Sequence, residues 1–118
     1  MEAALPRVLS AEQDDLLRLL GYIYLQHGRA AQSAILFHAI HALRPDDRFA
    51  ARALACSWLR SGKAREALPL LDLLIERGDR SPLVHLLRGQ ALSQMGRRAE
   101  SFQAMRLFVS ARAGAGEG

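Results

Sequence analysis

Apolar residues recur every three to four positions along most of the chain, and short polar breaks interrupt them at regular intervals. This period is that of the α-helix, so each apolar segment predicts an amphipathic helix that buries one face. The breaks contain glycine or proline, which commonly follow the end of a helix. The pattern predicts six helices, at about Ala11–His27, Ala30–Leu43, Arg48–Arg60, Ala64–Arg77, Pro82–Gln94 and Arg98–Arg112.

Local signals agree with these helix ends. Ser10 with Gln13 three residues later fits a capping box, and Ser81 before Pro82 fits an N-cap followed by a proline at the first helical position. Pro69 lies a turn inside the fourth predicted helix, where it should kink the helix or delay its start. Residues 1–9 show no period and are predicted to be a flexible lead, and the tail AGAGEG, residues 113–118, is predicted to be disordered.

Glycines in the polar breaks are evenly spaced. Gly28, Gly62 and Gly96 are 34 residues apart, and each lies in the turn between two predicted helices. A constant period of this length indicates copies of one helix-turn-helix unit. The three copies span about 14–47, 48–81 and 82–112.

Equivalent positions of the three copies carry side chains of similar size. Small residues recur where two antiparallel helices must approach closely: Gly21, Ala55 and Gly89, then Ser33, Ala67 and Ser101. Large residues recur where the space between helices must be filled: Tyr24, Trp58 and Leu92, then Phe37, Leu71 and Met105. This pattern with a 34-residue period is typical of the tetratricopeptide repeat. We therefore predict an all-α fold, a single domain over residues 10–112, with three such repeats stacked as a short right-handed solenoid.

The first helix of each hairpin lines a concave face in such a stack. The positions beside the packing residues predict a mainly apolar groove, with Tyr22 and Phe49 as anchors and Arg18 and Arg52 at one end. Such a groove suits an amphipathic helix or an extended apolar segment of a partner. The predicted partner-binding residues are Arg18, Tyr22, Leu25, Phe49, Arg52, Cys56, Leu59, Leu83, Leu86 and Gln90.

Two other interpretations of these positions stay open. The apolar residues would instead be core if the repeat register is displaced by one residue. Capture of an acidic C-terminal peptide, another use of these repeats, requires lysines and asparagines on the concave helices. Tyr22, Cys56 and Gln90 occupy those places here, which argues against that use.

The last predicted helix has apolar residues on more than one face. This surplus predicts a second interface with a partner or with another copy of the chain, although a wide core stripe explains it equally well. The residues concerned are Phe102, Met105, Phe108 and Val109.

Composition narrows the function classes. The net charge of +4 comes from fifteen arginines and one lysine against twelve acidic residues, but the arginines are scattered over all helices, so solvated helix faces explain them better than a nucleic-acid surface. Cys56 is the only cysteine, so an internal disulfide is excluded. No segment resembles a signal peptide or a membrane span, which favours a soluble, cytoplasmic protein without membrane insertion.

Candidate chemistry is sparse. His38 and His41 lie on one predicted helix, but Cys56 and His85 belong to other hairpins and complete no zinc motif. The glycines follow no strand and precede no Lys-Ser or Lys-Thr pair, so no phosphate loop is predicted. No nucleophile, base and orienting acid stand out. We expect no enzyme activity, no cofactor and no metal.

The stretch LLGYIYLQHGRAAQSAILFHAIHALRPDD resembles the YscY-like family of small tetratricopeptide chaperones of bacterial type III secretion systems. The similarity extends over nearly the whole chain but is specific only between about Leu16 and Pro45. It implies a non-enzymatic cytoplasmic chaperone that forms a heterodimer with a small secreted protein of the YscX type, and a pair that engages the cytoplasmic ring of the export gate.

The chain departs from the related translocator chaperones, since it lacks their longer N-terminal helical extension, which serves in dimerisation. This argues against a homodimer of their kind. The alternatives are a generic tetratricopeptide adaptor or scaffold that self-associates or binds another protein, and a chaperone of another type III substrate such as a translocator or needle subunit.

Overall fold

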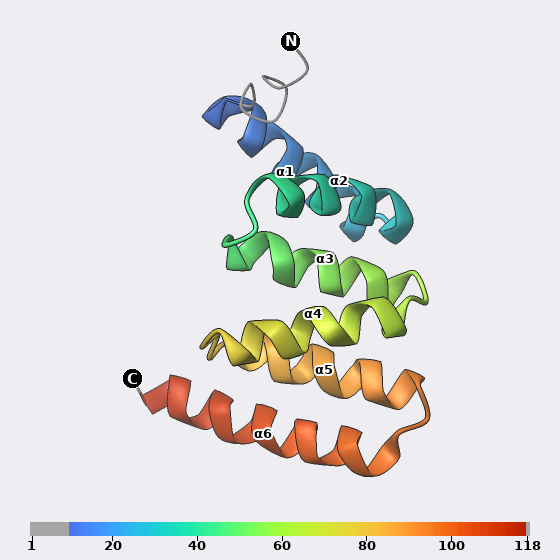
Figure 1. Ribbon diagram of the computed structural model, residues 1–118, viewed down its shortest axis with the longest axis vertical. Coiled ribbons are helices and arrows are strands. Elements are labelled where there is room, and N and C mark those ends of the chain that lie inside the picture. The colour runs from blue at the N-terminus through green and yellow to red at the C-terminus, as the bar shows by residue number, and fades with distance from the viewer. Residues whose placement is uncertain (1–9, 118) are drawn as a thin grey trace.

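The structure is a computed structural model that describes residues 10–117, with side chains described through residue 114. The predicted lead, residues 1–9, lies outside the described part. The described chain forms six α-helices (Figure 1): α1 (Ala11–Gln26), α2 (Ala30–Leu43), α3 (Arg48–Arg60), α4 (Ala64–Glu76), α5 (Pro82–Gln94) and α6 (Arg98–Glu117). The all-α prediction is confirmed, and α2, α3 and α5 begin and end at the predicted residues.

The six helices are stacked in chain order, and the two ends of the chain lie at opposite ends of the stack (Figure 1). Each helix contacts the next in sequence, and α3 also contacts α5. The molecule is elongated, with extents of 49 × 32 × 26 Å. The α1–α2 hairpin therefore forms one end of the stack, and the α5–α6 hairpin forms the other.

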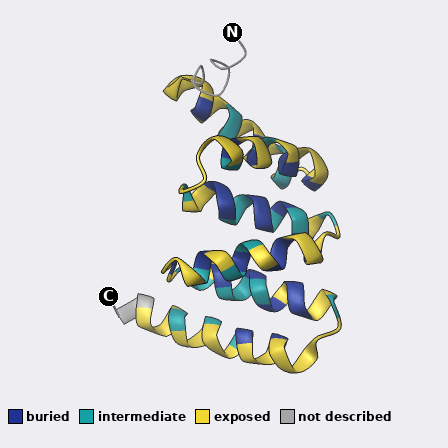
Figure 2. Ribbon diagram, viewed as in Figure 1, coloured by how far each residue is buried: buried dark blue, intermediate teal, exposed yellow. Residues whose placement is uncertain are grey.

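The buried apolar side chains lie mainly in the middle of the stack. Buried residues concentrate on the central helices, whereas α1 and α6 are largely exposed (Figure 2). One core cluster joins α2 to α3 around Phe37, Ile40 and Leu54, and a larger one joins α3, α4, α5 and α6 around Leu71 and Leu92. Removal of this apolar surface from water is the main force that holds successive hairpins together.

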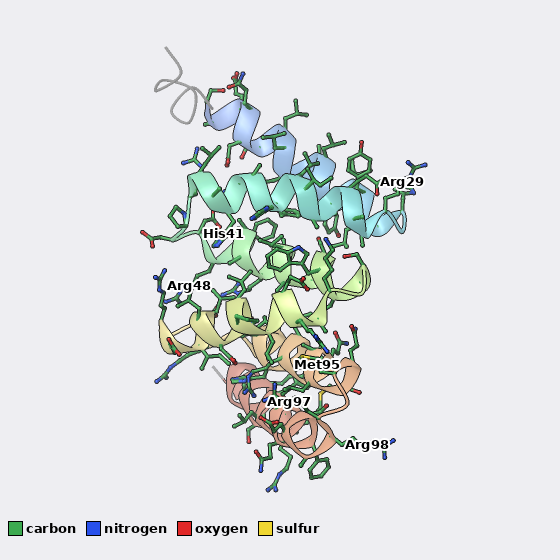
Figure 3. All side chains as sticks on the ribbon, turned by 45° about the vertical axis from the view of Figure 1, so that its right-hand side comes forward. Arg29, His41, Arg48, Met95, Arg97 and Arg98 are labelled. Atoms are coloured by element: carbon green, nitrogen blue, oxygen red, sulfur yellow. The ribbon has the colours of Figure 1, made fainter. Side chains whose placement is uncertain are left out.

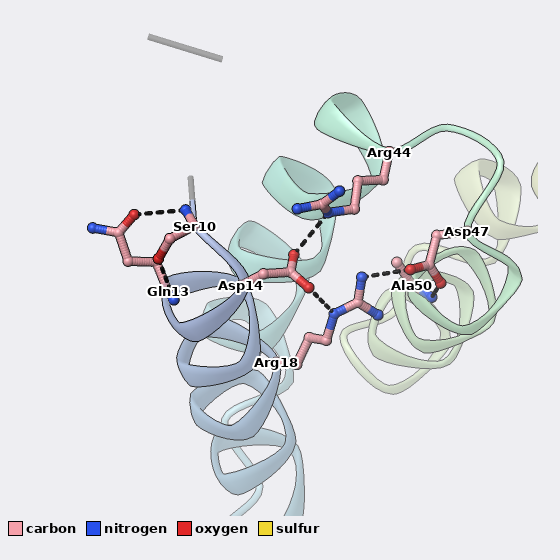
Figure 4. Close-up of polar contacts among 7 residues, drawn as sticks. All are labelled: Ser10, Gln13, Asp14, Arg18, Arg44, Asp47 and Ala50. Carbon is pink, nitrogen blue, oxygen red and sulfur yellow. Dashed lines mark hydrogen bonds and ion pairs between the residues drawn. The ribbon is translucent and has the colours of Figure 1, made fainter. Parts of the chain in front are cut away.

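Helix ends follow the predicted capping chemistry. The Ser10 hydroxyl accepts a hydrogen bond from the Gln13 backbone N–H at 3.1 Å, and the Gln13 side chain accepts one from the Ser10 N–H at 2.9 Å (Figure 4). Gly28, Gly62 and Gly96 have φ of +76°, +83° and +76°. This left-handed conformation ends a helix at little steric cost only in glycine, which explains why glycine recurs in the turns.

One local prediction is wrong. Helix α6 continues to Glu117, although residues 113–118 were predicted to be disordered. The final segment contains several alanines, which have the highest helix propensity, and no proline to stop the helix. Helix α4 begins at Ala64, as predicted, so Pro69 inside it does not delay its start. Pro69 is exposed, so the carbonyl that loses its hydrogen bond there can be solvated.

In the first and last hairpins, the two helices approach closely at the small residues that the repeat predicts. The Ser33 hydroxyl donates to the Gly21 carbonyl at 2.8 Å, and the Ser101 hydroxyl donates to the Gly89 carbonyl at 2.8 Å. A Cβ at Gly21 would lie 2.8 Å from the Phe37 ring, and a Cβ at Gly89 would lie 2.9 Å from the Met105 methyl group. Both contacts are shorter than van der Waals distance, so a Cβ at either position requires the neighbouring side chain to move.

These two glycines are expected to respond differently to alanine. Phe37 is a rigid, buried ring, so Gly21→Ala should lower the free energy of unfolding by roughly 1 kcal/mol, as overpacking outweighs the gain in helix propensity. Met105 is flexible and half-buried, so Gly89→Ala should be neutral or stabilising by up to about 1 kcal/mol. Urea unfolding of both variants measures the difference. Equal destabilisation by the two substitutions would show that the rigidity of Phe37 and the flexibility of Met105 do not decide the outcome.

Candidate partner-binding surface

The predicted groove residues lie on α1, α3 and α5, and the structure leaves several of them open to solvent. Tyr22 and Phe49 are each 50% exposed. Leu83 and Gln90 are also exposed, whereas Leu25, Cys56 and Leu86 are half-buried. Tyr22 makes a hydrogen bond only to Gln26 among described residues, at 3.1 Å. The two aromatic anchors are therefore not part of the closed core.

A hollow lies where α3, α5 and α6 meet. Its volume is about 560 Å³, within the size range of small-ligand sites and large enough for side chains of a bound segment. Both apolar and polar groups line it: Cys56, Leu59, Arg60, Leu86, Leu87, Gln90, Ser93, Gln94, Ser101 and Met105. We call it the α3–α5 hollow. It brings together four predicted groove residues from two different hairpins.

Some predicted site residues are placed differently from expectation. Leu59 is only 5% exposed and packs in the larger core cluster, so it forms the floor of the hollow and no open surface. Met105, predicted at a second interface, is half-buried against Gly89, and Phe108 is also half-buried. Phe102 and Val109 remain exposed on α6. The contribution of α6 to the hollow was missed, because only the first helix of each hairpin was assigned to the groove.

Arg18, predicted as a cation at one end of the groove, is held by carboxylates (Figure 4). Its Nε donates to Asp14 at 2.7 Å, and its second guanidinium nitrogen donates to Asp47, which lies just before α3. Arg44 also donates to Asp14, at 3.0 Å. The Arg18 guanidinium lies 5.7 Å from the centre of the Phe49 ring, a cation–π arrangement. Arg18 thus ties α1 to the start of α3.

Arg52 repeats this arrangement one unit later. Two of its nitrogens donate to the two carboxylate oxygens of Asp79, both at 2.8 Å, and Asp79 lies in the turn before α5. The Asp79 side chain is 1% exposed and also accepts the Ser81 backbone N–H at 3.0 Å. Both predicted groove arginines therefore connect successive hairpins. Because their charge is already satisfied, they are poor receptors for an acidic ligand.

The carboxylates of these connections have lowered pKa values. The hydrogen bond from Arg18 lowers the pKa of Asp14, against the opposing effect of burial. For Asp47 and Asp79 burial alone would raise the pKa, but the hydrogen bonds from Arg18 and Arg52, with backbone N–H groups, outweigh it and lower the pKa below its ordinary value. All three groups are therefore stabilised as carboxylates in the folded state.

Acid should weaken the fold through these groups. A pKa that is lower in the folded than in the unfolded chain gives stability above the unfolded value of about 3.9, and this stability is lost as the pH falls through the folded values. We expect these three carboxylates to contribute no change in the free energy of unfolding between about pH 7 and 5 and a progressive fall below about pH 4. Urea unfolding at each pH measures the free energy of unfolding. An Asp79→Asn variant should show a shallower fall, and equal stability at pH 3 and 7 would contradict the assignment.

Other chemistry-bearing residues are dispersed. Burial raises the pKa of the Cys56 thiol, although Arg60 opposes the shift, so the thiol stays protonated at neutral pH. Burial, then the charges of His38 and Arg77, lower the pKa of His41. Within residues 10–117, no three His, Cys, Asp or Glu side chains come together to hold a metal ion. None of the helices there combines the length and the apolar character that crossing a membrane requires.

Comparisons with known proteins do not identify a family. No model of a protein family matches the chain, and no curated protein matches it.

Proposed function

We propose that this protein is a non-enzymatic binding module of the tetratricopeptide type, whose groove across α1, α3 and α5 holds an apolar segment of another protein. The observation that carries the proposal is the exposure of Tyr22, Phe49 and Leu83 on α1, α3 and α5, of which α3 and α5 also line the α3–α5 hollow. Exposed aromatic and aliphatic groups beside a hollow are typical anchors of a partner helix or strand.

Repeated contacts support the tetratricopeptide architecture. Left-handed glycines recur at 34-residue intervals, and the serine-to-glycine-carbonyl bond of the first hairpin recurs in the third. The connection of Arg18 to Asp47 recurs as that of Arg52 to Asp79. The glycine turns and the serine-to-glycine bonds recur at equivalent positions, and each arginine reaches a carboxylate in the turn that follows its hairpin, which favours a regular solenoid with a concave side.

The chemistry of the groove favours an apolar partner. Its two arginines are engaged with buried or half-buried carboxylates, so they leave little free positive charge for an acidic peptide. A contact of ordinary size buries about 800 Å² on each partner. A segment that fills the hollow and covers Tyr22 and Phe49 would place its apolar side chains out of reach of water.

The resemblance to YscY-like chaperones supplies the proposed biological setting. The partner would be a small secreted protein of a type III secretion system, held in the cytoplasm so that its apolar segment neither aggregates nor assembles before export. The complex would then engage the cytoplasmic ring of the export gate. Affinity capture by the wild-type chain and by a Tyr22→Asp variant tests this function, because capture should depend on the groove.

A second candidate is an adaptor that binds another protein through α6. The exposure of Phe102 and Val109 favours it, since both lie on the uncovered end helix. Capture that is lost with Phe102→Glu and retained with Tyr22→Asp would favour this adaptor over the groove-binding chaperone.

A further inference from the structure

An exposed apolar stripe runs along α1 beside the predicted groove residue Tyr22. Leu16, Leu19, Leu20 and Ile23 are 63%, 55%, 36% and 39% exposed. Their spacing of three, four and seven residues places them on one side of the helix. A helix at the surface normally presents polar residues on its open side, so this side of α1 has the pattern of a buried face. We call these four residues the α1 stripe.

The neighbouring helix extends this unpartnered surface. Helix α2 contains no aspartate, glutamate, lysine or arginine among its 14 residues. Phe37 and Ile40 face the core, but Ile35 on the other side is exposed. The exposed side of α2 also carries Gln32 and His38, so it is uncharged without being wholly apolar.

Charges at the two ends of the α1 stripe indicate what covers it. Glu12 lies one turn before Leu16, and Arg29 follows Ile23 in the turn between α1 and α2 (Figure 3). Neither Glu12 nor Arg29 forms an ion pair with any residue that the structure describes. The stripe therefore has a negative end and a positive end, and no other described residue neutralises either charge.

We propose that two copies of this chain associate through the α1 stripe, with the two α1 helices antiparallel about a two-fold axis near Leu19 and Leu20. In this arrangement Glu12 of each copy lies near Arg29 of the other, so the surface is complementary to itself, as a two-fold interface requires. The dimer goes beyond the proposed function. It leaves Phe49 and the α3–α5 hollow, which lie on other helices, outside the interface.

The opposite end of the stack does not offer the same arrangement. The exposed side chains Phe102 and Val109 of α6 are accompanied by Arg98, Arg106 and Arg112. Two copies joined through this helix would bring like charges together, which opposes association. Charge therefore favours the α1 stripe over α6 as the surface shared by two copies.

Sedimentation equilibrium of the full chain tests the dimer. The wild type is expected at about 26 kDa, twice the 13.0 kDa of one chain. Leu19→Glu should give the mass of one chain with an unchanged helical circular dichroism spectrum, since Leu19 is outside the core. Phe102→Glu, which places the same charge on an exposed apolar position at the other end, should remain dimeric.

A charge exchange tests the antiparallel arrangement. Glu12→Arg should raise the dimer dissociation constant roughly tenfold, because two attractive pairs become repulsive, and adding Arg29→Glu should restore it to within about threefold. A monomeric wild type, or a dimer lost with Phe102→Glu and kept with Leu19→Glu, would overturn the proposal. So would a dimer that forms only after removal of residues 1–9, because those residues would then be the occupant of the stripe, or a double variant no tighter than Glu12→Arg.

Discussion

Replacement of Asp79 by alanine is expected to lower the free energy of unfolding by about 3 kcal/mol. The Asp79 carboxylate is 1% exposed and accepts two hydrogen bonds from Arg52 and one from the Ser81 N–H. Its removal leaves a half-buried guanidinium and a backbone donor without their acceptor, and both lose water on folding. It also removes a connection between the second and third hairpins. Urea unfolding followed by circular dichroism measures the loss.

The ion pair of Asp72 with Arg88 provides the matched control. These side chains approach to 2.6 Å, but Asp72 is 43% exposed and can be solvated when its partner is absent. Asp72→Ala should therefore cost no more than about 1 kcal/mol. Similar losses for Asp79→Ala and Asp72→Ala would show that the burial of Asp79 does not determine the stability of the stack.

Tyr22→Asp is expected to weaken partner capture at least about 100-fold, the effect of losing a central anchor and placing a charge against an apolar segment. Tyr22 is half exposed and donates no hydrogen bond to the core, so the fold should lose no more than about 1 kcal/mol from the lower helix propensity of aspartate. Affinity capture with the tagged chain, followed by identification of the bound protein, measures the effect.

Leu107→Asp is the matched control for this variant. Leu107 is 51% exposed on α6, so the substitution adds the same charge at a position of similar exposure away from the groove helices. Phe49→Asp is a less clean test, because Phe49 packs edge-on against Phe37 at 6.1 Å and lies beside Arg18. Capture that survives Tyr22→Asp, or fails equally with Leu107→Asp, would remove the groove from the account.

Local structure was predictable because its causes are local. The capping box of Ser10 and Gln13, the N-cap before Pro82 and the glycines of the turns each act within a few residues. The fit of Gly21 against Phe37 was also predictable, because the repeat brings the same pair of positions together in every unit. The predicted end of α6 was wrong because glycine in the tail disfavours a helix and alanine favours one, and the helix propensity of alanine was the stronger effect.

The connections between hairpins were not predicted, because they depend on where a turn places a side chain. Asp47 is 29 residues from Arg18, and Asp79 is 27 residues from Arg52, so the carboxylates do not keep the 34-residue register that the arginines keep. Leu59 was assigned to the surface for a related reason: its side chain points between α3 and its neighbours into the core. Helical periodicity gives a direction around one helix, but not the position of the next helix.

The reactivity of Cys56 tests the central claim most directly. Cys56 is the only cysteine and lines the α3–α5 hollow, so a thiol reagent reports whether the groove is occupied. We predict that maleimide modifies Cys56 at least about tenfold more slowly in the captured complex than in the free chain, because a bound segment excludes solvent and reagent. An equal rate in both, with the partner still bound, would show that the partner binds elsewhere.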